Sequence, residues 1–171
     1  MSSKVIAAVD SMRKRFDAYE LPINLDSLAE KAGIQIKYGD FEAEMSGFAY
    51  QKAGTKFIGV NIAESDVRQR FTIAHEFGHI FMHRHDSLSY DPNVELVHFR
   101  NGHSTTGTDP KEREANAFAA ELLMPEQIVR KEIKDMQGID LHDSVAVGRL
   151  ADKFGVSQAA ITVRLASLYG I

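Results

Sequence analysis

The chain has 171 residues, 44% of them apolar and 9% aromatic, which is the composition of a compact globular protein with one hydrophobic core. Its 24 acidic and 20 basic residues give a formal net charge of −4, which argues against nucleic acid as the main partner because phosphate binding needs a local excess of Lys and Arg. It has no cysteine, so disulfides and thiolate ligands are excluded and any metal must be held by nitrogen and oxygen donors.

The start of the chain does not predict export or a membrane anchor. The apolar stretch at residues 5–9 is interrupted by Asp10, and Arg13 and Lys14 follow closely. This stretch is too short for the core of a signal peptide or for a membrane span. We therefore expect a cytoplasmic protein that does not associate with a membrane.

Two amphipathic helices are predicted first. Apolar residues recur at helical spacing over residues 5–19, and this helix should end before Pro22. Asn24 can cap a second helix over residues 25–32, and Gly33 can end it. Both apolar stripes are most simply core packing.

Three short segments rich in β-forming residues follow, and they predict a small antiparallel sheet: residues 34–38, 47–50 and 56–61. An edge strand of a sheet can hold an extended peptide by backbone pairing. Because the strand Lys56–Asn61 runs directly toward the next helix, it is the candidate for that role. The alternative is an ordinary strand of the sheet core.

Residues 71–82 predict an apolar helix without proline, and it contains the sequence His-Glu-Phe-Gly-His at positions 75–79. On a helix His75 and His79 lie one turn apart on the same face, so both imidazoles can reach one metal ion. Glu76 projects beside them toward a metal-bound water. The alternative, a core helix with histidines bonded inward, would need several buried polar partners at once. The pattern therefore predicts a zinc site with Glu76 as the general base.

Two histidines leave such a site one protein ligand short, because catalytic zinc usually takes three. His85 has the spacing of a metzincin signature, but that signature needs glycine where this chain has Met82. Without that glycine the helix has no obvious reason to turn there. Glu112 and Glu114, in a later helix, are the other candidates.

The later helix should run from the N-cap Asp109 to a stop at Pro125. Within it Glu112 and Asn116 share a side with small and apolar residues that permit close approach of another helix: Ala115, Ala119 and Leu123. We expect Glu112 to ligate the metal and Asn116 to orient a ligating histidine. Glu114 lies about 200° round the helix and is the weaker candidate. The alternative for Glu112 is an acid that only complements the helix dipole.

Residues 84–109 predict a long loop that lines the cleft and could act as a lid or set specificity. Within it residues 94–99 have the pattern of a short strand. Possible contacts for the substrate or for a tetrahedral oxyanion are His83, Tyr50 and Asn61, and within the loop His98, His103, Tyr90 and Arg100. For each of them a surface or packing role is the alternative.

Residues 147–165 have helix-turn-helix character, with small, turn and apolar residues where that motif places them: Ala151, Gly155, Val156 and Ile161. However, Arg164 occupies a usually apolar position and is the only basic residue of the would-be recognition helix, 158–168. We therefore expect a packing or partner-docking unit and not a DNA-binding one. We divide the chain into a peptidase domain, residues 1–135, and a helical C-terminal extension, residues 136–171.

Two stretches together resemble the ImmA/IrrE family of zinc metallopeptidases. They are RFTIAHEFGH at positions 70–79 and EREANAFAAELLMP at positions 112–125. The resemblance extends upstream through residues 21–34 and 47–50 to Asn61, so it covers most of the chain from about residue 20 to residue 130.

This resemblance implies a gluzincin-like site in which His75, His79 and Glu112 hold zinc and Glu76 is the base. It also implies a protein substrate, because the family is associated with cleavage of a partner repressor of the Xre helix-turn-helix type. Mobile elements and damage responses are the settings in which such pairs occur.

The sequence thus predicts an α+β fold, with helices around a small antiparallel sheet, a zincin-like HExxH helix and a helical C-terminal extension. The expected function is that of a zinc-dependent endopeptidase. The main rival is a metal-containing transcription factor or sensor that acts through its C-terminal helices without proteolysis. A metallo-hydrolase of non-peptide substrates is a third possibility.

Overall fold

The computed structural model describes residues 2–41, 45–52, 55–83 and 109–170. In these residues helices and a three-stranded sheet form the α+β fold that the sequence predicts. The elements are α1 (Ser3–Phe16), α2 (Leu25–Ala32), β1 (Gln35–Gly39), β2 (Gly47–Lys52), β3 (Thr55–Asn61), α3 (Asp66–Met82), α4 (Pro110–Leu123), α5 (Glu126–Asp135), α6 (Ser144–Phe154) and α7 (Gln158–Tyr169).

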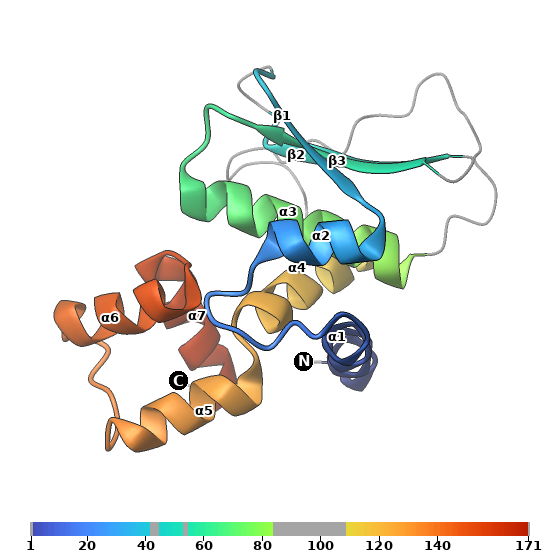
Figure 1. Ribbon diagram of the computed structural model, residues 1–171. Helices are drawn as coiled ribbons and strands as arrows, with labels where there is room; N and C mark the ends of the chain where they lie inside the picture. The colour runs from blue at the N-terminus through green and yellow to red at the C-terminus, as the bar shows by residue number, and fades with distance from the viewer. Residues whose placement is uncertain (1, 42–44, 53–54, 84–108, 171) are drawn as a thin grey trace.

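The elements are arranged in layers around α3 (Figure 1). The sheet lies on one side of α3, which packs against β2 and β3, and α4 lies on the other side. Helix α1 packs against α4, and α2 packs against β1 and α3. Helices α5 to α7 form a group at the end of α4 that lies away from the sheet. Helix α3, which carries the HExxH sequence, is therefore central to the molecule.

The sheet is mixed, which corrects the antiparallel sheet that the sequence predicts. Its strand order is β1-β3-β2, with β1 parallel and β2 antiparallel to β3. The predicted substrate-binding edge strand, Lys56–Asn61, is β3, and it lies in the centre of the sheet with both edges paired. Its buried Ile58 and Val60 are core residues, and the edge strands of the sheet are β1 and β2.

Predicted helix boundaries are confirmed where capping residues define them. The Asn24 side chain accepts from the Ser27 N–H at 2.9 Å, and Gly33 ends α2 in the left-handed region at φ 69°. The Asp109 side chain accepts from the Lys111 N–H at 2.8 Å at the start of α4. Helix α1 ends at Phe16, earlier than expected, and the sequence reasoning did not identify α5.

Helices α3 and α4 approach closely at Gly78. A Cβ atom at Gly78 would lie 2.9 Å from Cα and 3.1 Å from the carbonyl oxygen of Ala115, so even one methyl group would not fit between the backbones. Ala115 and Ala119 are fully buried in this contact, as the predicted seam of small residues requires. The close approach brings the first turn of α4 beside the histidines of α3.

The two C-terminal helices have a helix-turn-helix connection, with Gly155 in the left-handed region at φ 63°. Buried Arg164 on α7 pairs with buried Glu121 on α4, and its Nε donates to the Met124 carbonyl at 3.0 Å. From α3, Arg70 donates to the carbonyl of Gly155 at 3.0 Å. Polar contacts thus attach these helices to both helices of the HExxH layer.

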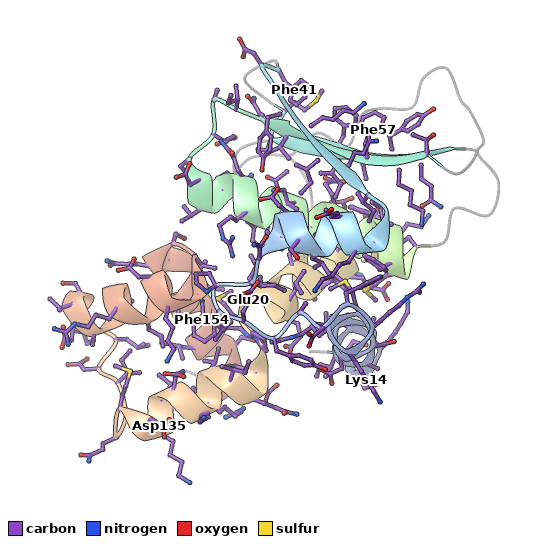
Figure 2. All side chains as sticks on the ribbon, viewed as in Figure 1. Lys14, Glu20, Phe41, Phe57, Asp135 and Phe154 are labelled. Atoms are coloured by element: carbon purple, nitrogen blue, oxygen red, sulfur yellow. The ribbon has the colours of Figure 1, made fainter. Side chains whose placement is uncertain are left out.

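The apolar core is continuous from α1 to α7. It includes Val9 of α1, Phe77 of α3 and Phe118 of α4. Phe154, labelled in Figure 2, belongs to the same core among the C-terminal helices. The division into domains at residue 135 stays a prediction. Among the described helices, none has the length and apolar character needed to cross a membrane.

Candidate metal centre

Three side chains from two helices converge on one point. Nε2 of His75 and Nε2 of His79, both on α3, are 2.8 Å apart. The Glu112 carboxylate from the first turn of α4 lies 3.4 Å from Nε2 of His75 and 3.2 Å from Nε2 of His79. One donor atom from each of the three lies within 4.8 Å of the others, which is compatible with a shared metal ion. The geometry therefore brings together the three residues predicted as ligands.

Asn116 fixes the orientation of the His75 ring. Its Oδ1 atom lies 2.9 Å from Nδ1 of His75. An amide oxygen can only accept a hydrogen bond, so His75 carries its proton on Nδ1 and directs the lone pair of Nε2 toward His79 and Glu112. This is the arrangement expected of a metal-ligating histidine with a second partner on its other nitrogen. Asn116 thus lies where the helical phase predicts it.

Glu76 is buried beside the three converging side chains. Burial raises the pKa of its carboxyl to about 7, while the nearby His79 lowers it and the Glu112 charge raises it. The Ala49 backbone on β2 forms a hydrogen bond with this carboxylate. The Oε1 atom of Glu76 has no hydrogen-bond partner among the described residues. A buried carboxylate with an open acceptor and a pKa near neutrality is suited to take a proton.

The electrostatics of the cluster favour an anionic Glu112 and a neutral His75. The neighbouring imidazoles of His75 and His79 hold the pKa of Glu112 well below its usual range. Burial lowers the pKa of His75, because the protonated imidazole would lose its hydration. Two neutral imidazole nitrogens and one carboxylate form the donor set that zinc accepts. Together with the open Oε1 of Glu76, this donor set fits a zinc ion.

Glu114, the weaker candidate ligand, points elsewhere. Its carboxylate pairs with Lys4 of α1 at 2.9 Å and lies 3.8 Å from Nδ1 of His83. His83 donates from Nε2 to the Lys111 carbonyl at 3.2 Å, and its ring centroid is 5.6 Å from that of His79. His83 is therefore close to the candidate centre, although its ring nitrogens face α4.

The structure does not bring Tyr50 or Asn61 to the cluster. Tyr50 stacks on Phe57 with ring centroids 4.8 Å apart, on the sheet face opposite α3, because adjacent residues of a strand point to opposite faces (Phe57 is labelled in Figure 2). Asn61 is buried, donates to the Met45 carbonyl at 2.8 Å and accepts from the Ala63 N–H at 3.0 Å. The side chain of Asn61 therefore links the segment that follows β3 to the segment that precedes β2.

The remaining candidates lie outside the described residues. These are His85 as a metal ligand, the loop at residues 84–108 with its strand at 94–99, and the possible contacts His98, His103, Tyr90 and Arg100. Their roles stay predictions.

Sequence reasoning missed the part that β2 plays. Gly47 and Ala49 face α3, and a Cβ atom at Gly47 would lie 2.4 Å from the Thr72 side chain, so small residues allow this strand to lie against the HExxH helix. The available signal was the alternation of small and aromatic residues in Gly-Phe-Ala-Tyr, which places the small ones on the helix side. The backbone of Ala49 thereby reaches Glu76.

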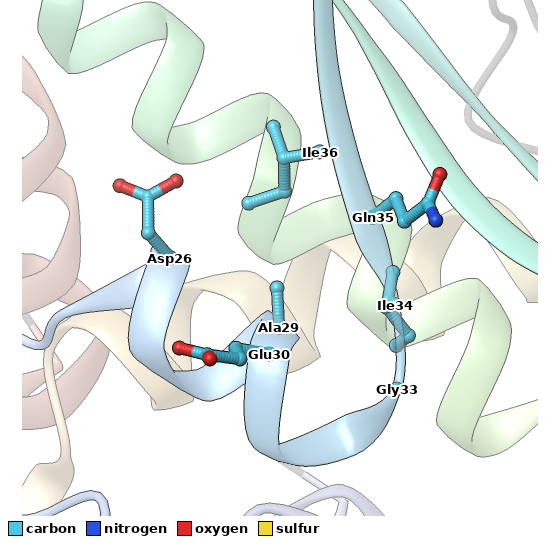
Figure 3. Close-up of a pocket in the computed structure, with 7 residues that line it drawn as sticks. All are labelled: Asp26, Ala29, Glu30, Gly33, Ile34, Gln35 and Ile36. Carbon is cyan, nitrogen blue, oxygen red and sulfur yellow. The ribbon is translucent and has the colours of Figure 1, made fainter.

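A separate hollow lies between α2 and β1, away from this cluster (Figure 3). Its ionisable lining residues, Asp26 and Glu30, both lie on α2, and it has no histidine. Its two carboxylates come without a third donor among the described lining residues, whereas catalytic zinc usually takes three protein ligands. The chemistry is therefore concentrated at the interface of α3, α4 and β2.

Comparison with known proteins agrees with this geometry. No curated protein sequence matches the chain significantly. A solved Mycobacterium tuberculosis transcriptional regulator shares the fold, with a TM-score of 0.62 at 18% identity. The match covers 95% of this chain but only 46% of the regulator, so this chain spans less than half of that protein. At this identity the similarity shows the fold alone.

A family model described as IrrE N-terminal-like domain, Peptidase_M78, matches residues 29–166. The match covers most of the chain, including the HExxH helix and α4, and it confirms the resemblance inferred from the motifs. Such membership supports a metallopeptidase in general. The chain belongs to the Peptidase_M78 family of IrrE N-terminal-like domains.

Proposed function

We propose that this protein is a zinc-dependent endopeptidase. The observation that carries the proposal is the convergence of His75, His79 and Glu112 beside Glu76, whose buried Oε1 has no partner among the described residues. In a purely structural role, burial of this oxygen would cost free energy that no hydrogen bond to it offsets. A role as proton acceptor explains why it is there.

In the proposed mechanism His75, His79 and Glu112 hold the zinc. Zinc supplies Lewis acidity to a water molecule and to the scissile carbonyl. Glu76 would accept a proton from that water on its buried carboxylate and then deliver it to the leaving amine. Asn116 keeps the His75 ring in one tautomer, and the Ala49 backbone holds the Glu76 carboxylate in place.

The proposed substrate is another protein, a helix-turn-helix repressor of the Xre type, cut in an exposed linker or loop. A folded helix cannot pair as a strand, whereas an extended segment can add to the edge strand β2 beside Glu76. The repressor class itself is supported by the family resemblance. The location of the reaction in the cytoplasm is part of the same proposal.

The rival function is transcriptional regulation without proteolysis. Two observations make it worth considering: the fold neighbour from M. tuberculosis is a transcriptional regulator, and α6 and α7 have a helix-turn-helix connection. In α7 the basic residue Arg164 is buried against Glu121, and no other Lys or Arg occurs in this helix. A recognition helix without an exposed basic residue lacks the phosphate contacts that dominate DNA affinity. The structure therefore favours the peptidase.

The test is incubation of the zinc-loaded protein with the repressor encoded beside its gene, read by intact-mass spectrometry. Cleavage should require zinc, stop with a chelator, and fall by roughly 10²- to 10⁴-fold in Glu76→Gln, which retains the ligands. Equal cleavage by zinc-loaded Glu76→Gln would refute the mechanism. A chain that shifts operator DNA by itself and leaves the repressor uncut would establish the rival.

A further inference from the structure

A cavity of about 410 Å³ lies beside the candidate metal centre, lined by residues of α3, α4 and α7. Asn116, which orients His75, forms part of its wall. Phe71, one helical turn before His75, forms another part, and the two ring centroids are 6.5 Å apart. The cavity therefore lies next to the His75 ring and shares Asn116 with the candidate centre. Its volume falls within the range of about 300–1,000 Å³ that is usual for ligand pockets.

The wall of this cavity is apolar. Besides the ring of Phe71 it presents the methyl and thioether groups of Ala120, Met124 and Val163. The charged residue among its lining residues, Arg164, is buried and already engaged by the Glu121 carboxylate and the Met124 carbonyl. A charged ligand would lose its hydration there without gaining a counter-ion, whereas an apolar group would be stabilised by burial.

Helix α7 turns a second apolar face toward this cavity. Ile161 and Leu165 are buried on its core side, while Ala159 and Val163, one turn apart, line the cavity on the other. Val163 is 70% exposed. A single exposed valine needs no explanation, but a helix that is apolar on both sides is typical of one with a further partner.

We propose that this cavity receives an apolar side chain of the peptide substrate, so that α7 determines the side-chain specificity of cleavage. The inference rests on the proposed peptidase function. A peptide extended beside the centre advances about 3.3 Å per residue, and one helical turn separates Phe71 from His75 by about 5.4 Å. The side chain therefore belongs to a residue within one or two positions of the scissile bond.

Binding to the cavity is tested without any cleavage. The full-length zinc-loaded protein, labelled at its Val and Met methyl groups, is titrated with N-acetyl-leucinamide and, for comparison, with N-acetyl-asparaginamide. The leucine amide should shift the Val163 and Met124 methyl signals and saturate, and the asparagine amide should not. Ala159→Phe, which adds a ring at the cavity wall, should abolish the shifts. Unshifted signals, or equal shifts at the distant Val145, would overturn the proposal.

Specificity is tested on a library of peptides from a digested proteome, with cleavage sites read by mass spectrometry. The wild type should prefer aliphatic or aromatic residues at one fixed position near the cut, and Val163→Glu should lower kcat/KM for these peptides by about 10-fold or more. The matched control is Val145→Glu on α6, where the valine is 61% exposed and does not line the cavity.

The two proposals fail in different ways. Cleavage that shows no apolar preference, or an unchanged preference in Val163→Glu, would overturn the cavity proposal and leave the peptidase in place. If the wild type and Glu76→Gln cut the same peptides, the proposed function fails. The methyl titration then decides the cavity proposal by itself.

Discussion

The amide oxygen of Asn116 lies 2.9 Å from Nδ1 of His75, so a residue of α4 sets the proton position on a ring carried by α3. The same helix supplies Glu112 one turn earlier. The candidate centre therefore depends on how α4 is placed along α3, and the following predictions test that dependence.

Asn116→Ala should lower zinc affinity by about 10- to 100-fold, because the His75 ring loses the partner that fixes its tautomer. Competition with a chromogenic chelator measures the affinity. Asn116→Asp keeps an acceptor at the same place and is the matched control, expected to bind zinc about as well as the wild type. Unchanged affinity in Asn116→Ala would show that the ring needs no partner.

Glu112→Ala should lose more zinc affinity than any change at Asn116, since it removes a ligand. Glu114→Ala, two residues along the same helix, should leave zinc affinity nearly unchanged, because its carboxylate pairs with Lys4 and not with the histidines on α3 that face Glu112. Metal content after gel filtration separates the two variants. The opposite order would mean that Glu114 is the ligand.

Glu76 should make the metal-free protein less stable as the pH rises. Its pKa is about 7 in the folded state and 4.5 in the reference state, so between these values the folded state binds more protons and the free energy of unfolding falls with rising pH. The shift corresponds to a loss of the order of 3 kcal/mol above the upper value.

Glu76→Gln should remove this loss. The variant should match the wild type below about pH 4.5 and be more stable above about pH 7, as measured by urea unfolding without metal. If the difference in free energy of unfolding between wild type and variant stays constant over this pH range, Glu76 is not in a buried environment that raises its pKa.

Gly78→Ala should separate α3 from α4, because its Cβ would meet backbone atoms of Ala115 that cannot move independently. We expect a loss of about 1–3 kcal/mol of stability and weaker zinc binding, since Glu112 moves with α4. Gly148→Ala on α6 is the control. Its Cβ would meet only the end of the flexible Gln158 side chain, at 3.0 Å, so the gain in helix propensity of up to about 1 kcal/mol should prevail.

The convergence of the three candidate ligands was predictable because it depends on local rules. Helical periodicity placed His75 and His79 on one face, and the Asp109 cap with Pro110 fixed the phase that puts Glu112 and Asn116 together. The seam of small residues on α4 predicted the close helix contact that the structure has at Ala115.

The sheet was less predictable because strand order depends on contacts between distant residues. Nothing within the strand Lys56–Asn61 indicates that it pairs on both sides, and this put the edge strand in the wrong place. The side of the sheet on which Tyr50 lies depends on tertiary contacts in the same way, since it follows from Ala49 facing α3. Helix α5 went unnoticed although Val129 and Ile133, one turn apart, are its buried face.

Nine consecutive residues of α3, from Thr72 to Ile80, are buried, and the two histidines and Glu76 are among them. Binding sites are usually drawn from the parts of a fold that open most easily. Here the backbone amides of the chemical centre belong to the core, so their exchange with deuterium should require opening of the whole fold. The geometry of the candidate centre should therefore persist unchanged until the protein unfolds, and any motion that opens the centre must come from elements outside α3.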